Sequence, residues 1–171
     1  SADEALALLT VRLPDPKGYG RIVRGADGLV RGIVEEKDAS DAERTITEVY
    51  SGILAVPARL LLQWLPRLSN QNAQGEYYLT EVVAMAVAQG VPVTTHTIDD
   101  AVQVAGVNSP AQLAELERAY QTRTAAALME QGVRLADPAR FDLRDDARSG
   151  ARAELVCAQD VEIDVGCIFT G

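Results

Sequence analysis

Short runs of aliphatic and β-branched residues alternate with glycine and proline along the first part of the chain. Residues 6–13 are mostly aliphatic and stop at Pro14, which predicts a buried strand. Residues 22–23 and 29–30 flank a Gly-Ala-Asp-Gly turn, which predicts a hairpin whose second arm continues into 32–38. Residues 39–44 are polar and rich in turn-forming residues, which predicts a turn. Residues 45–56 predict a central strand, 93–98 a further strand and 102–104 a short one.

Helical spacing appears in three places. One helix is predicted over 57–65, ended by Pro66. A second is predicted over 79–87 behind Thr80, which can cap it, and Gly90 closes it. A third begins at Ser109 with proline next to it and runs to Gly132. Its predicted apolar stripe consists of Leu113, Leu116, Tyr120, Ala127 and Leu128.

Strands and helices alternate as far as Gly132, which predicts an α/β domain with a mixed sheet and a ligand site beyond the carboxyl ends of its strands. After Pro138 the segments become short, and Ile163 and Phe169 stand six residues apart. An ordinary strand explains that spacing. A parallel β-helix also has a six-residue period, but two positions do not establish a repeat.

Composition narrows the classes of function. The chain has 171 residues, is 47% apolar and carries a formal charge of −9, with scattered arginines. It fits one domain, or one with part of a second, and it lacks the cationic surface that nucleic acids or anionic membranes require. Cys157 and Cys167 with a lone His96 make neither a zinc cluster nor a disulfide framework, so free thiols in the cytoplasm are expected. Ser1 is not an initiator residue, so we expect further sequence to precede it.

Four segments carry a family resemblance. They are DPKGYGRI at 15–22, GIVEEKDA at 32–39, NAQGEYYLT at 72–80 and GVN at 106–108. In this order and spacing they resemble the bacterial bifunctional N-acetylglucosamine-1-phosphate uridylyltransferase and glucosamine-1-phosphate N-acetyltransferase family. The first two occur more loosely across sugar-1-phosphate nucleotidyltransferases, whereas the third is more particular to this family.

The resemblance implies a domain plan. Residues 1–110 would form the sugar-binding half of a Rossmann-like uridylyltransferase domain, 111–131 a connector helix, and 132–171 the first turns of a left-handed parallel β-helix that begins the acetyltransferase domain. The parent enzyme would be a cytoplasmic homotrimer that uses UTP, N-acetylglucosamine-1-phosphate, Mg²⁺ and acetyl-CoA. The family's nucleotide loop lies upstream and its acetyl-transfer histidine downstream, so residues 1–171 hold no catalytic residue and are expected to catalyse neither step alone.

The resemblance also implies site residues. Gly20 would offer a backbone donor to the sugar and Glu35 would hydrogen-bond the N-acetylglucosamine, although a turn glycine and a solvated strand-end carboxylate explain them equally well. Tyr78 and Thr80 would line the sugar pocket. Tyr50 stands where the family commonly has a sugar-contacting asparagine, and a phenol can also donate and accept.

Asn108 matches the family residue that helps hold Mg²⁺, since a neutral oxygen suits a hard cation. A turn-forming asparagine before Ser-Pro is the structural alternative. Two other readings stay open for the whole chain: a monofunctional nucleotidyltransferase for another sugar phosphate, and a noncatalytic sugar-nucleotide-binding module. Sequence beyond either end would separate them, since the bifunctional family has a nucleotide loop before this stretch and aliphatic-glycine hexads after it.

Overall fold

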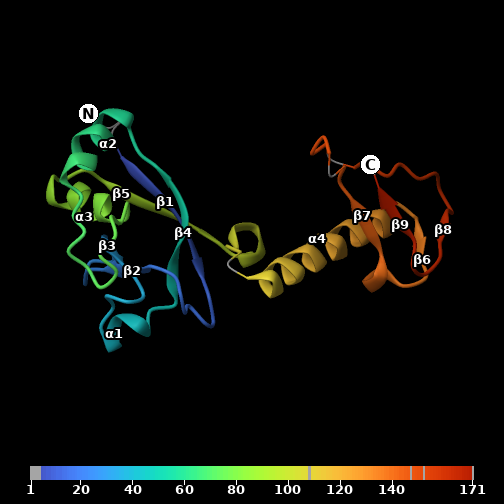
Figure 1. Cartoon of the computed structure of the whole chain (residues 1–171), viewed down its shortest axis with the longest axis horizontal. Coiled ribbons are helices and arrows are strands. Elements are labelled where there is room, and N and C mark those ends of the chain that lie inside the picture. Colours follow the sequence, from blue (N-terminus) through green and yellow to red (C-terminus); the bar gives the residue numbers. More distant parts are fainter. Residues whose placement is uncertain (1–4, 108, 147, 152, 171) are drawn as a thin grey trace. The chain divides into compact units, whose positions relative to one another are not determined.

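The chain forms two compact units, residues 1–106 and 107–171. A computed structural model describes residues 5–107, 109–146, 148–151 and 153–170. In Figure 1 the first unit runs from blue to green-yellow and the second from yellow to red. None of the described helices is long and apolar enough to span a membrane.

The first unit is built on a mixed five-stranded sheet. Its strands are β1 (Leu6–Arg12), β2 (Arg21–Arg24), β3 (Val30–Val34), β4 (Glu48–Ala55) and β5 (Val93–Ile98), in the order β3-β2-β4-β1-β5. β1 and β5 are parallel, and the other neighbours are antiparallel. The predictions of an α/β fold, of the β2–β3 hairpin and of a central strand within 45–56 are therefore confirmed.

Helices α2 (Ala58–Trp64) and α3 (Glu81–Ala88) pack on the sheet and close the main core (Figure 1). Pro57 stands at the start of α2, and Pro66 lies in the 3₁₀ turn η1 (Leu65–Arg67) that ends it, as the sequence predicted. The fully buried Trp64 contributes its indole to this core, and its N–H donates to Gln89 Oε1 at 3.1 Å. The core therefore holds a large aromatic whose one polar atom is paired.

Three local predictions for the first unit are wrong. Residues 101–104 form a 3₁₀ turn, η2 (Ala101–Val104), because the Asp100 carboxylate accepts from the Val102 N–H at 3.2 Å and starts a helical turn. Residues 41–44 form a short helix, α1 (Asp41–Arg44), where only a polar turn was expected. The Thr80 side chain makes no capping bond to α3, and its own backbone is already helical.

The second unit begins with α4 (Pro110–Glu130), whose start agrees with the sequence prediction. Ser109 Oγ accepts from the Gln112 N–H at 3.2 Å, and Pro110 occupies the first helical position. The rest contains β6 (Arg134–Leu135), the 3₁₀ turn η3 (Pro138–Arg140), β7 (Asp142–Arg144), β8 (Glu162–Ile163) and β9 (Ile168–Thr170). Two parallel pairs join these strands, β6 with β8 and β7 with β9.

The buried face of α4 differs from the predicted stripe. Gln121, Ala125 and Leu128 are its buried residues, whereas Leu113 is 57% exposed. Gln121 is buried because its amide bonds to the backbone of β7: Nε2 donates to Leu143 O and Oε1 accepts from the Leu143 N–H, both at 2.8 Å. Hydrophobic periodicity does not predict a buried glutamine, because it assigns polar side chains to the exposed face of a helix.

A separate hydrophobic core holds the second unit together. Its buried members are Ala125, Leu128, Val133, Phe141, Leu143 and Ile163. Phe169 packs against them, with its ring centroid 5.9 Å from that of Phe141. Ile163 and Phe169, the pair noted for their six-residue spacing, thus meet at one core from β8 and β9, which are successive strands in two different sheets.

Candidate functional site

Glu35 lies directly after β3, half-buried, and accepts a hydrogen bond from Thr80 Oγ1 at 2.8 Å. Thr80 is buried just before α3, so its hydroxyl serves this carboxylate and not the helix end. The bond joins two of the four family-like segments across 45 residues of sequence. Thr80 therefore fixes the orientation of the Glu35 carboxylate, and the second carboxylate oxygen, Oε2, can still accept a hydrogen bond from a ligand.

Gly20 lies beside the same carboxylate, just before β2. A Cβ built at Gly20 would lie 2.8 Å from Ile33 Cγ2 and 3.4 Å from Glu35 Oε2. The Gly20 carbonyl accepts from the Tyr50 N–H at 2.9 Å, which ties it to β4. Gly20 is buried, and any side chain at this position would push Ile33 or Glu35 aside.

Two tyrosines lie within electrostatic reach of the Glu35 carboxylate. Burial raises the pKa of Tyr50, and the negative charge of Glu35 raises it further. Burial also raises the pKa of Tyr78, to which the charges of Asp38, Glu35 and Glu76 add. The Tyr78 hydroxyl is buried and has no hydrogen-bond partner of normal geometry, although the Asp38 carboxylate lies near it. Both phenols keep their protons at neutral pH and can donate to a ligand.

The structure thus gathers five of the six candidate residues: Gly20, Glu35, Tyr50, Tyr78 and Thr80. The sixth, Asn108, lies outside the described residues. Within the described part of the chain, no group of three or more His, Cys, Asp or Glu side chains could hold a metal ion.

An ion pair beside the site escaped sequence reasoning. Arg21 is only 2% exposed, and its guanidinium donates to the Tyr19 carbonyl and to Glu36 Oε2, the latter at 2.5 Å. The Gly18 N–H donates to the same Glu36 oxygen at 3.3 Å. The hydrogen bond from Arg21 lowers the pKa of Glu36. The sequence signal was an arginine directly after Gly-Tyr-Gly, where one arm of the hairpin begins, together with a Glu-Glu pair directly after the other arm.

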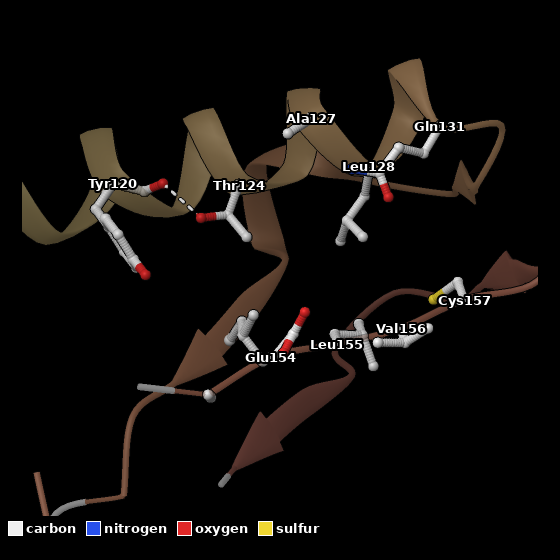
Figure 2. Close-up of a pocket in the computed structure, with 11 residues that line it drawn as sticks. Tyr120, Thr124, Ala127, Leu128, Gln131, Glu154, Leu155, Val156 and Cys157 are labelled. Atoms are coloured by element: carbon white, nitrogen blue, oxygen red, sulfur yellow. Dashed lines mark hydrogen bonds between the residues drawn. The ribbon is translucent and has the colours of Figure 1, made fainter. Parts of the chain in front are cut away.

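The second unit has a cavity of about 640 Å³ between α4 and residues 153–157. In Figure 2, Tyr120, Thr124 and Leu128 of the helix face Glu154 and Leu155 of the opposite segment. The described lining residues include the carboxylate of Glu154 but no lysine or arginine.

Comparison with known proteins supports the family resemblance, although no protein-family model matches the chain. The matching relatives are bifunctional proteins. They are named bifunctional protein GlmU: that of Acidovorax sp. (strain JS42) is 78% identical over 170 residues, which are 99% of this chain and 36% of the relative. That of Polaromonas naphthalenivorans (strain CJ2) is 63% identical over 98% of this chain and 34% of the relative.

A more distant relative gives the same result. The bifunctional protein GlmU of Azoarcus sp. (strain BH72) is 56% identical over 100% of this chain and 36% of its own length. The resemblance carried by the four segments is therefore confirmed. The chain spans about a third of the length of these relatives.

Proposed function

We propose that residues 1–110 are the sugar-binding half of the uridylyltransferase domain of an enzyme that makes UDP-N-acetylglucosamine. In this reaction a phosphate oxygen of N-acetylglucosamine-1-phosphate attacks the α-phosphorus of UTP, and pyrophosphate leaves. One observation carries the proposal: Gly20, Thr80, Tyr50 and Tyr78 converge on the Glu35 carboxylate in a chain 78% identical to a bifunctional GlmU protein.

The chemistry of these side chains suits an N-acetylated sugar. A carboxylate accepts from sugar hydroxyl or amide N–H groups, and Glu35 has an oxygen that Thr80 does not use. The Tyr78 hydroxyl is a buried donor without a partner, which an oxygen of the ligand would satisfy. The missing side chain at Gly20 lets the ligand approach the backbone. These residues would bind and orient the sugar phosphate for in-line attack, which is the main protein contribution to phosphoryl transfer.

The metal proposal rests on the resemblance. Mg²⁺ would offset the charge of the two phosphorylated substrates, with Asn108 as this chain's ligand and a carboxylate from elsewhere in the enzyme as its partner. The chain itself carries a formal charge of −9, which adds to the negative charge that a bound cation would neutralise.

The second unit extends the proposal to the acetyltransferase. We assign 111–131 to a connector helix and 132–171 to the first turns of a left-handed parallel β-helix, in an enzyme that acetylates glucosamine-1-phosphate with acetyl-CoA. The parallel pairs β6–β8 and β7–β9 support this, because successive coils of a β-helix stack in parallel register. The parent enzyme would be a cytoplasmic homotrimer. A monofunctional nucleotidyltransferase or a sugar-nucleotide-binding module would not need this second unit.

The test uses the full-length protein that contains this chain. It should release pyrophosphate from UTP and N-acetylglucosamine-1-phosphate with Mg²⁺, whereas the isolated 171-residue chain should not exceed a blank. Replacing Glu35 by alanine removes a charged hydrogen bond, so the KM for the sugar phosphate should rise about 10- to 150-fold. The KM for UTP should change little.

Glu115→Ala serves as the control, since Glu115 is exposed on α4 in the second unit. Its KM values should equal those of the unmodified enzyme. An unchanged KM for the sugar phosphate in Glu35→Ala would remove Glu35 from the sugar site.

A further inference from the structure

Residues 35–38 form a turn in which three carboxylates have separate partners. The Asp38 N–H donates to Glu35 O at 3.0 Å, which brings the two acidic residues onto one turn after β3. Glu35 accepts from Thr80 and Glu36 from Arg21. Asp38 Oδ1 accepts from the backbone N–H of Ala73 at 2.8 Å, 35 residues downstream. Asp38 thus connects the end of the sheet to a distant loop.

That loop, residues 68–78, has no regular helix or strand and is mostly exposed. Asn72 shapes it from within: its Oδ1 accepts from the N–H groups of Gln74 and Glu76 at 3.1 and 3.2 Å, and its Nδ2 donates to Glu76 O at 2.5 Å. These bonds give the loop a form but do not fix it against the sheet. The Asp38–Ala73 bond does fix it, close to the middle of the loop.

The loop ends at Tyr78, whose hydroxyl lies near the carboxylates of Asp38 and Glu35. Because the residues before Tyr78 have no ladder of backbone bonds, the direction of its side chain depends on how the loop is attached. Detaching the loop from Asp38 removes one of its attachments and leaves those to Glu81, through the Ser69 N–H and the Tyr78 carbonyl, so the phenol is held less firmly toward Glu35.

We propose that Asp38 is a positioning residue that attaches the 68–78 loop to the sheet and so holds Tyr78 over the sugar site. This rests on the proposed function, which supplies the site. The Asp38 carboxylate accepts from the Ala73 N–H and lies near the Tyr78 hydroxyl, and both contacts need an acceptor oxygen at this position. Asparagine at this position would keep an acceptor oxygen, whereas alanine would remove it.

The first experiment measures hydrogen exchange at the Ala73 amide in the 171-residue chain, without any substrate. Loss of one hydrogen bond should speed exchange about 2- to 12-fold in Asp38→Ala. Asp38→Asn should exchange at the unmodified rate. Asp41→Ala is the matched control: Asp41 is fully exposed and pairs only locally, with Arg44 at 3.3 Å. Both substituted positions, 38 and 41, are exposed, so the three variants should fold.

The second experiment measures uridylyl transfer by the full-length enzyme. Asp38→Ala should raise the KM for N-acetylglucosamine-1-phosphate by a factor similar to the exchange effect, about 2- to 12-fold, with a much smaller change in kcat. Asp38→Asn should restore the unmodified KM. A carboxylate that touched substrate or metal through its charge would instead make Asp38→Asn as defective as Asp38→Ala.

The outcomes separate the two proposals. Unchanged Ala73 exchange in Asp38→Ala, or equal defects in the Asn and Ala variants, would overturn the positioning role. If Glu35→Ala leaves the sugar-phosphate KM unchanged while Ala73 exchange responds to Asp38→Ala as expected, the proposed sugar site fails and the attachment of the loop stands.

Discussion

Gln121 of α4 supports the most specific stability prediction. It is fully buried, and its amide both donates to and accepts from the Leu143 backbone at 2.8 Å. Replacing it by leucine preserves volume but leaves the Leu143 N–H and C=O without these partners. Each orphaned buried group costs about 1–3 kcal/mol, so Gln121→Leu should destabilise the second unit by about 2–6 kcal/mol.

The assay is urea unfolding of the 171-residue chain followed by far-UV circular dichroism, which reports the long helix α4. Trp64 is the only tryptophan and lies in the core of the first unit, so its fluorescence is an internal control. The fluorescence midpoint should move much less than the dichroism midpoint. Thr122→Ala, at an exposed position on the same helix, should change the unfolding free energy by less than about 0.5 kcal/mol.

The reasoning would be refuted if Gln121→Leu unfolded at the same urea concentration as the unmodified chain. That result would mean that water reaches the Leu143 backbone or that β7 shifts to find other partners. Gln121→Glu provides a second check. This variant keeps an acceptor for the Leu143 N–H but loses the donor to Leu143 O. It also places a carboxylate next to Glu117, whose Oε1 accepts from Gln121 Nε2 at 2.8 Å in the unmodified chain. It should therefore be no more stable than the leucine variant at neutral pH.

Two further predictions concern the first unit. Glu48 is buried, and the hydrogen bond from Arg24 lowers the pKa of its carboxyl below the ordinary 4.5. The ionised carboxylate therefore stabilises the fold fully above pH 4.5, and this stabilisation is lost as the pH falls through the lowered pKa. In acid unfolding, the stability gap between the unmodified chain and Glu48→Gln should close over that range; a constant gap would contradict the linkage. Gly20→Ala should lower the free energy of unfolding by about 1–3 kcal/mol, because the new methyl group would clash with Ile33 Cγ2. Ile33→Ala should relieve that clash, so calorimetry should show that the double variant loses less stability than the sum of the two single variants.

Periodicity predicted the elements of the first unit well because each has one buried face and a clear boundary residue. Pro57 and Pro66 bracket α2, and the glycines of the 25–28 turn set the hairpin. The errors occur where a side chain bonds to nearby backbone. Asp100 turned a predicted strand into η2, and the capping box of Ser40 and Glu43 formed α1 within an apparent turn. The Ser-x-x-Glu spacing at 40–43 is itself a sequence signal for the start of a helix.

The candidate site depended on a different kind of information. Composition and residue spacing predicted an α/β fold but no reaction. The family resemblance identified Gly20, Glu35 and Tyr78 as candidate site residues. Neither source predicted that Thr80 would bind Glu35 instead of capping α3, because that contact spans 45 residues and depends on the register of the whole sheet. For the same reason the Arg21–Glu36 pair was visible only once β2 and β3 lay side by side.

The parallel pairs of the second unit have a consequence for tolerance of sequence change. Arg134 pairs with Glu162 and Asp142 with Ile168, which fixes the contacts at the strands. Between β7 and β8, Ala153, Leu155 and Val161 pack against the core of the unit, whereas residues 148–151 are exposed. Lengthening a loop costs little entropy, about 0.6 kcal/mol for each doubling. Residues 148–151 are therefore where an insertion or a peptide tag can be accommodated while both ladders keep their register.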